Sequence, residues 1–224
     1  MDKNKNQLIG ILLLAAILFF GLCATARAEE SRSDALDWRS KQVLVVAGEI
    51  DNSLVPLSQQ LMLAAKKSKE VFIFINSPGG AVIPGNIFVQ AMEVVKARGG
   101  TINCAVSNIA ASMAMHILAH CSTRHILAGG YLLFHEVRAS VPRAISPSEA
   151  TTLLEALHAI SFYLEEYLIG VLRTDRVFYD RHNKAETLWS AELFALMFPN
   201  FQLKIIRDIK LPKEAEDFLF APAG

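Results

Sequence analysis

The chain has 224 residues, and its 22 lysines and arginines are balanced by 22 aspartates and glutamates. This length is enough for one domain with a substantial core. The formal net charge of zero, without a large basic cluster, argues against nucleic acid as a partner, because nucleic-acid-binding domains carry a basic patch.

The N-terminus has the pattern of a secretory signal peptide. Lys3 and Lys5 precede an unbroken apolar run over residues 8–20, and Ala26-Arg27-Ala28 fits the small-x-small cleavage pattern. We therefore expect a signal peptide over residues 1–28 and a single domain over residues 29–224. Exported chains of this kind work outside the cytoplasm, and we expect a periplasmic location.

Two other arrangements of this segment stay open. An uncleaved signal would anchor the chain in a membrane, although the apolar run is short for a full span. A lipid anchor on Cys23 is the second alternative. In each of these cases the rest of the chain still lies outside the cytoplasm.

Cleavage after Ala28 would remove Cys23 and leave Cys104 and Cys121. An even number of cysteines in an oxidising compartment is compatible with a disulfide. Two buried free thiols are the alternative, since cysteine often packs in cores.

The first two thirds of the chain alternate between strand and helix patterns. We expect strands at residues 42–49, 71–75, 101–106, 124–127 and 131–134, and helices at residues 53–68, 86–97 and 109–119. Such alternation predicts an α/β domain with a largely parallel sheet.

The pattern then changes to a long helix over residues 146–172. Ser146-Pro147 followed by Glu149 is a helix start signal. A helix of more than 25 residues is long for one globular layer, so it can protrude and pack against another subunit. Beyond it we expect helices at residues 175–181 and 190–197 and a strand at residues 202–206, whereas the tail from Lys210 has no clear pattern.

A glycine pair follows the second predicted strand. Asn76-Ser77-Pro78-Gly79-Gly80 is a dense loop signal between a buried strand and a helix. Adjacent glycines allow close approach of a ligand to the backbone, and their N–H groups can point outwards. Gly79 and Gly80 are therefore candidates for an oxyanion hole.

Ser112 is a candidate nucleophile, because it lies at a predicted strand-to-helix turn between small residues, as in a nucleophile elbow. It would otherwise be a small residue packed at a crowded helix start. His135 follows a short apolar strand, where a general base could be held on a rigid edge. Local evidence alone favours a histidine without a catalytic role at this position. The sequence around Glu186 indicates only an exposed acid.

A metal site is a weaker alternative. His116 and His120 are four residues apart on a predicted helix, with Cys121 and His125 nearby. Two histidines at this spacing can bind zinc, but the glutamate of the His-Glu-x-x-His motif is absent. We expect no metal and no other cofactor.

Several motifs together resemble the caseinolytic protease P (ClpP) family of serine peptidases. They are I-N-S-P-G-G at 75–80, A-A-S-M at 110–113, the histidine at 135 and W-S-A-E at 189–192. The similarity keeps one order from about Val43 to Phe198. It implies a crotonase-like βαβ superhelix, with residues 146–172 as the protruding handle helix of a homo-oligomer.

The resemblance also implies roles for individual residues. Ser112 would be the nucleophile, His135 the general base and Glu186 the orienting acid, where the family has aspartate. Asp175 and Asp180 are rival acids. The backbone N–H groups of Gly79, Gly80 and Met113 would form the oxyanion hole.

The leading hypothesis is an exported serine endopeptidase that hydrolyses peptides or unfolded proteins through an acyl-enzyme on Ser112. An exported chain has no access to the ATP-driven unfoldase of cytoplasmic family members. The alternatives are an inactive oligomeric scaffold of the same fold and an acyl-thioester hydrolase, because fold alone does not decide function.

Overall fold

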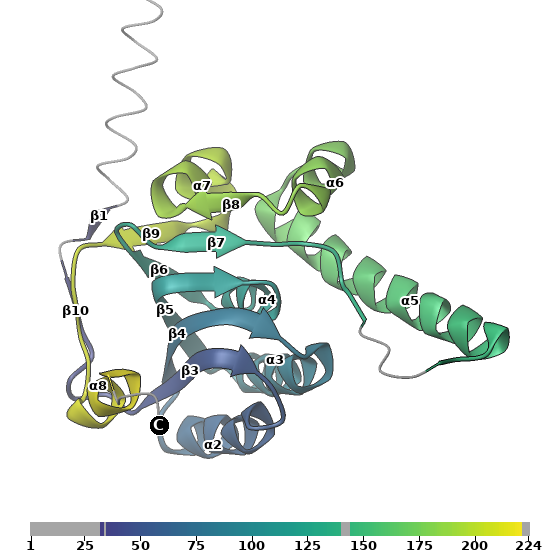
Figure 1. Ribbon diagram of the computed structural model, residues 1–224. Coiled ribbons are helices and arrows are strands. Elements are labelled where there is room, and N and C mark those ends of the chain that lie inside the picture. Colours follow the sequence, from purple (N-terminus) through teal and green to yellow (C-terminus); the bar gives the residue numbers. More distant parts are fainter. Residues whose placement is uncertain (1–31, 34, 140–143, 221–224) are drawn as a thin grey trace, which may run out of the picture.

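The computed structural model describes residues 32–33, 35–139 and 144–220 (Figure 1). The predicted signal peptide, residues 1–28, lies outside this part of the chain. Within the described residues, no helix combines the length and the apolar character needed to cross a membrane.

One sheet of eight strands forms the centre of the molecule. Its main path runs β1-β9-β6-β5-β4-β3, and the pairs along it are parallel. β7 adds to the end of β5 in parallel and pairs with β8 in the antiparallel direction. The strands are β1 (Arg32–Ser33), β3 (Val43–Ile50), β4 (Glu70–Gly80), β5 (Thr101–Ala111), β6 (Thr123–Leu127), β7 (Tyr131–Leu133), β8 (Leu188–Ser190) and β9 (Leu203–Ile206).

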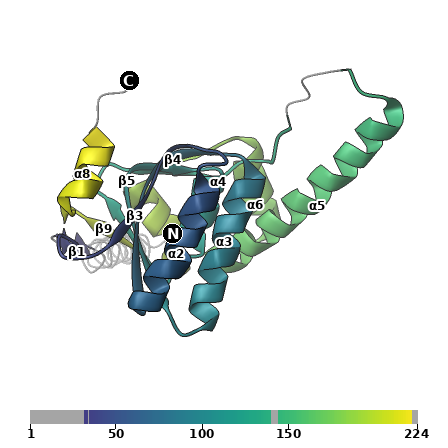
Figure 2. The same ribbon diagram turned by 90° about the horizontal axis from the view of Figure 1, so that it is seen from below.

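Helices connect these strands and cover the sheet. They are α2 (Leu54–Lys67), α3 (Val82–Ala97), α4 (Met113–Ala119), α5 (Pro147–Leu172), α6 (Arg176–Lys184), α7 (Ala191–Met197) and α8 (Lys213–Phe220), with a short 3₁₀ turn η1 (Pro199–Phe201). Figures 1 and 2 show α2, α3 and α4 together along one face of the sheet, with α8 on the other side. This arrangement confirms the α/β class expected from the alternating pattern.

The apolar run at the start of β4 is explained by burial on both faces of the sheet. Ile73 and Ile75 belong to the main core beneath α2, α3 and α4. Phe72 and Phe74 point the other way, into a smaller cluster that includes Trp38. Because alternate side chains of a strand face opposite sides, a strand covered on both sides is apolar throughout.

The segments that follow the first strands differ from the sequence-based expectation. β4 does not end at Ile75 but continues to Gly80, and Gly79 and Gly80 pair with Glu49 and Ile50 of β3. The expected glycine turn is therefore extended strand, and α3 already begins at Val82. Backbone pairing with β3 stabilises the extended form of this stretch, although its residues favour loops.

β5 is also longer than expected, because it continues to Ala111, and α4 begins only at Met113. The register between β4 and β5 shifts between the pairs Ile75–Val106 and Ser77–Ala110. Such irregularities redirect a strand near its end and are common next to active sites. Here the shift immediately precedes Ser112.

α5 has the bounds expected of a handle helix. Ser146 forms a reciprocal capping box with Glu149 at its start. Its buried residues, Leu164, Leu168 and Leu172, all lie in the C-terminal part. The N-terminal part extends away from the sheet in both ribbon views (Figures 1 and 2), which confirms the protruding helix.

The two ends of the described chain meet on the face of the sheet opposite α2. β10 (Ile209–Lys210) pairs with β2 (Leu36–Asp37) in a separate two-stranded sheet. α8 follows it and contributes Ala215 to the smaller cluster. The tail and the lead-in, which had no clear sequence pattern, thus cover β3 and β4 on this side.

Candidate active site

Ser112 occupies the junction between β5 and α4 in a strained backbone conformation. Its φ is +53° and its ψ is −123°, in a region that residues other than glycine rarely adopt. Its N–H donates to the carbonyl oxygen of Leu133, 2.9 Å away, at the end of β7. This bond ties the Ser112 turn to the strand that leads into His135. Strain of this kind at a serine that borders a cavity is a feature of nucleophile elbows.

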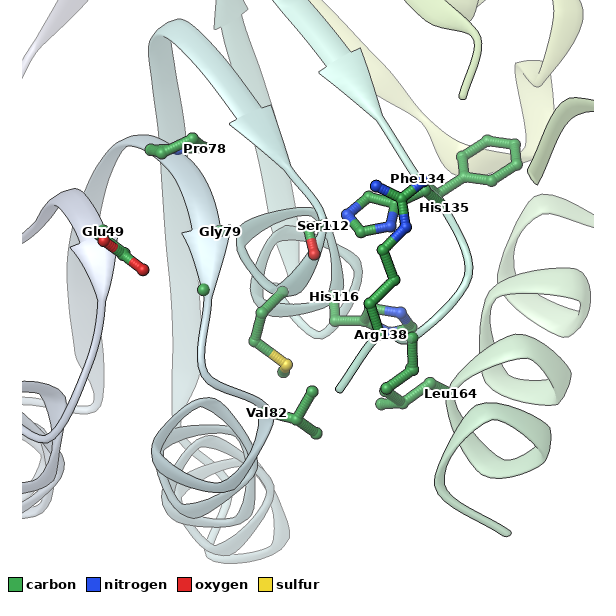
Figure 3. A pocket seen from close by; sticks show the side chains of 13 residues that line it. Glu49, Pro78, Gly79, Val82, Ser112, His116, Phe134, His135, Arg138 and Leu164 are labelled. Carbon is green, nitrogen blue, oxygen red and sulfur yellow. The ribbon is translucent and has the colours of Figure 1, made fainter. Parts of the chain in front are cut away.

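A cavity of about 350 Å³ opens beside this turn (Figure 3). All five residues Ser112, His135, Gly79, Gly80 and Met113 border it. In Figure 3 the ring of His135 lies on the same side of the cavity as the Ser112 hydroxyl. The structure thus brings together residues from the ends of β4, β5 and β7, which are far apart in the sequence.

The hydrogen bond of His135 fixes which ring nitrogen carries the proton. Its Nδ1 lies 2.7 Å from the backbone carbonyl oxygen of Glu136. A carbonyl oxygen only accepts, so Nδ1 is the donor and carries the hydrogen of the neutral ring. The other nitrogen, Nε2, then has a free lone pair and can accept a proton, as a general base requires.

The Glu186 carboxylate has a different partner from the one that the resemblance implies. It forms an ion pair with Arg138, which also borders the cavity. Glu186 lies in an exposed turn before β8 with φ +49°, and Arg138 lies on the segment that follows His135. The guanidinium of Arg138, rather than the His135 ring, therefore binds this carboxylate in the structure.

The two rival acids are also engaged elsewhere. Asp175 caps α6 by accepting from the N–H of Phe178 at 2.8 Å. Asp180 lies 3.4 Å from Arg176, whose guanidinium also binds carboxylates of α5. Among the described residues, no carboxylate is bonded to His135, and the Glu136 carbonyl oxygen orients its ring instead.

Close packing explains why residue 79 is glycine. A Cβ atom there would lie 2.5 Å from the Ala111 carbonyl oxygen and 2.5 Å from the Ser112 Cβ. The φ of Gly79 is also +96°. The glycine therefore lets β4 approach the Ser112 turn, and any side chain would displace that turn.

The candidate oxyanion donors differ in availability. The N–H of Gly79 donates to the Ser77 hydroxyl at 3.0 Å. Met113 is the first residue of α4, and an N–H at this position has no acceptor within its own helix. The N–H of Met113 is therefore better placed than that of Gly79 to bind an oxyanion.

The structure joins Cys104 and Cys121 in a disulfide, with their Cα atoms 6.0 Å apart. The bond connects β5 to the residue that follows α4 and its C-cap, so it closes the segment that carries Ser112. It also removes Cys121 as a metal ligand. His120 instead binds Glu93, and His125 binds the Cys104 carbonyl oxygen. No group of three or more potential ligands is found among the residues that the model describes.

His116 is a cavity residue whose position the sequence motifs did not reveal. It lies one helical turn after Ser112 and is 8% exposed, yet it borders the cavity (Figure 3). Burial lowers the pKa of His116 to about 3, with smaller contributions from the nearby histidines 120 and 135. Its ring is therefore neutral at physiological pH. The helical spacing of four residues from Ser112 was the available signal.

Comparison with known proteins gives the same family as the motifs. The family model described as Clp protease matches residues 27–155. Three relatives are named ATP-dependent Clp protease proteolytic subunit. The one from Phaseolus vulgaris is 35% identical over 146 residues, which are 64% of this chain and 65% of the relative. The one from Leuconostoc citreum is 27% identical over 173 residues, 75% of this chain and 85% of the relative.

The third relative, from Ligilactobacillus salivarius, is 34% identical over 101 residues, 42% of this chain and 49% of the relative. The chain thus spans slightly less than two thirds of the Phaseolus vulgaris relative and about half of the Ligilactobacillus salivarius relative. The family match covers 129 of the 224 residues and confirms the resemblance. The protein belongs to the Clp protease family.

Proposed function

We propose that the protein is an exported serine peptidase that cleaves peptides or unfolded chains. The observation that carries this proposal is the shared cavity of Ser112 and His135, with the ring of His135 held in the tautomer of a general base. The names of the relatives, which describe proteolytic subunits, also support it. A cavity of about 350 Å³ has room for side chains of an extended peptide but not for a folded protein.

The proposed reaction follows from this arrangement. Nε2 of His135 takes the proton of the Ser112 hydroxyl while Oγ attacks the peptide carbonyl carbon. The N–H groups of Met113 and Gly80 bind the resulting oxyanion. When the C–N bond breaks, His135 gives its proton to the leaving amine. Water, deprotonated by His135, then hydrolyses the acyl-enzyme and restores Ser112.

We assign Glu186 a supporting part in this reaction. The Glu136 carbonyl oxygen already accepts from Nδ1 of His135 and can stabilise the imidazolium that forms. Glu186 holds Arg138 at the mouth of the cavity. In this proposal Glu186 acts on the segment that follows His135 rather than on the ring itself.

Export is supported by two independent features. The apolar run at residues 8–20 precedes residue 27, where the family match begins. The Cys104–Cys121 disulfide would persist in the periplasm, whereas cytosolic thiols are normally kept reduced. The N-terminal residue of the protein recovered from a periplasmic extract tests cleavage after Ala28. Recovery of the protein in the cytosolic fraction alone would contradict export.

Homo-oligomer formation is supported by the surface of α5. Leu154, Phe162 and Tyr163 are each more than half exposed on the protruding helix. Exposed apolar groups on one helix are a common mark of an interface. Light scattering should give a mass above that of a monomer, and Phe162→Glu should lower this mass.

Peptidase activity is tested by incubating the protein with an unfolded protein and identifying the products by mass spectrometry. Wild type should release peptides, whereas Ser112→Ala and His135→Ala should not. Release of the same peptides by Ser112→Ala would contradict the proposal and leave the scaffold or a contaminant as the explanation. If only thioesters were hydrolysed, the acyl-thioester alternative would hold.

A further inference from the structure

The imidazole of His116 lies beside the proposed nucleophile on the same face of α4. The helix places residue 116 one turn after Ser112, and the His116 N–H lies 3.3 Å from the Ser112 carbonyl oxygen. Both side chains border the cavity. A group bound to the Ser112 hydroxyl would therefore have His116 within reach.

This ring has an unused hydrogen-bonding atom. The Nδ1 of His116 is enclosed and has no hydrogen-bond partner among the described residues. A buried polar atom without a partner is unfavourable, so it calls for an explanation such as a bound ligand or water. His120 and His125, the other buried histidines of this region, both have partners.

Apolar residues line part of the cavity that His116 borders, together with the charged Glu49 and Arg138. The apolar residues include Val82, Met113 and Leu164, of which Figure 3 labels Val82 and Leu164. The pKa of His116, about 3, keeps the ring uncharged, so it would not attract an acidic side chain by charge. A neutral imidazole carries one N–H donor and one lone-pair acceptor.

We infer that His116 determines specificity, by hydrogen-bonding a neutral polar side chain of the substrate residue whose carbonyl Ser112 attacks. The matching side chains are apolar along their length and polar at the tip, as in tyrosine and glutamine. Phenylalanine and methionine are the corresponding side chains without that polar tip. This inference rests on the proposed function for the place of the reacting carbonyl, but it concerns binding and can be tested without turnover.

The test measures binding of product-like peptides to the full chain carrying Ser112→Ala. Fluorescent peptides ending in tyrosine or phenylalanine, and a second pair ending in glutamine or methionine, are compared by anisotropy. We expect the polar member of each pair to bind about fivefold to tenfold more tightly, which is the usual effect of one added hydrogen bond.

Adding His116→Phe to the Ser112→Ala protein should bring the affinity ratio within each peptide pair close to one. Adding His116→Gln should keep part of the preference, because the amide still donates and accepts. His125→Phe is the matched control: it removes another buried imidazole, one that does not border the cavity, and should keep the ratios. Circular dichroism melting shows whether each variant is folded. Should His116→Phe fail to fold, His116→Leu takes its place.

Equal binding of tyrosine and phenylalanine peptides by the Ser112→Ala protein overturns the inference. A preference that survives in the folded His116→Phe or His116→Leu variant also overturns it. Peptide cleavage by wild type, measured in parallel, separates the two proposals. Cleavage by wild type without a difference in binding between the paired peptides would support the peptidase proposal and overturn the role of His116. A difference in binding without cleavage would support the role of His116 and contradict the peptidase proposal.

Discussion

Arg138 binds the Glu186 carboxylate at the edge of the cavity that contains Ser112 and His135. Both side chains are well exposed, at 68% and 40% of their surface. Exposed ion pairs contribute little to stability. The pair therefore matters mainly because it keeps this carboxylate occupied, while the Glu136 carbonyl oxygen binds Nδ1 of His135.

Glu186→Gln should consequently reduce kcat/KM for peptide cleavage by less than about tenfold. Loss of an acid that contacts the histidine directly typically costs about 10⁴ in kcat. Arg138→Gln is the matched control, since it removes the same ion pair and leaves the carboxylate. A loss of about 10⁴ in Glu186→Gln alone would show that Glu186 reaches His135 in the working enzyme.

Gly79→Ala should abolish activity. Its new Cβ would lie 2.5 Å from two atoms of the Ser112 turn, so the nucleophile must move. Gly48→Ala is the control, because Gly48 also has a positive φ, +72°, but has no atom within 4 Å of the added Cβ. In both variants the positive φ destabilises the alanine by about 1–2 kcal/mol. Equal kcat/KM in the two variants would contradict the close approach at Gly79.

Reduction of the disulfide should lower the free energy of unfolding by about 3 kcal/mol, the expected effect for a loop of this length. Urea unfolding with and without dithiothreitol measures this difference. The Cys104→Ala/Cys121→Ala variant should be equally stable in both conditions. If reductant has no effect on wild type, the bond is absent or makes no contribution.

Stability should fall in acid because of His116. Its pKa is about 3 in the folded protein, against an ordinary value of 6.5. Below pH 6.5 the unfolded chain therefore binds a proton that the folded protein does not, so the unfolding free energy falls until about pH 3. Each such proton contributes about 1.4 kcal/mol per pH unit.

His116→Phe should make this pH dependence shallower, as urea unfolding between pH 7 and pH 4 would measure. Burial lowers the pKa of His120 and His125 as well, so part of the dependence remains. His158→Phe, an exposed substitution on α5, should leave the slope unchanged. An unchanged slope in folded His116→Phe would argue that the ring is not buried in neutral form.

Much of the fold could be predicted because it depends on local patterns. The apolar run at residues 71–75 indicates a buried strand, and Ser146 with Glu149 marks the start of α5. The bounds of β4 and β5 could not be predicted in the same way. The last residues of β4 favour a loop and those of β5 fit the start of the expected helix, and only pairing with other strands makes both segments extended.

In the candidate site, too, local patterns could be predicted from the sequence and contacts between distant segments could not. Motifs indicated Ser112, His135 and the glycine pair, because nucleophile turns and oxyanion holes require particular small residues. The partner of Glu186 could not be predicted, since Arg138 reaches it only through the folded path of the segment after β7. The cavity position of His116 likewise depends on the exact start of α4.

The central claim is that Ser112 is an activated nucleophile. The most direct test is labelling with a fluorophosphonate probe near neutral pH, read by intact mass and peptide mapping. We predict one adduct on Ser112 of the wild-type protein, none in Ser112→Ala and at least about tenfold slower labelling in His135→Ala. Folded wild type that labels no faster than Ser112→Ala would contradict the serine peptidase account.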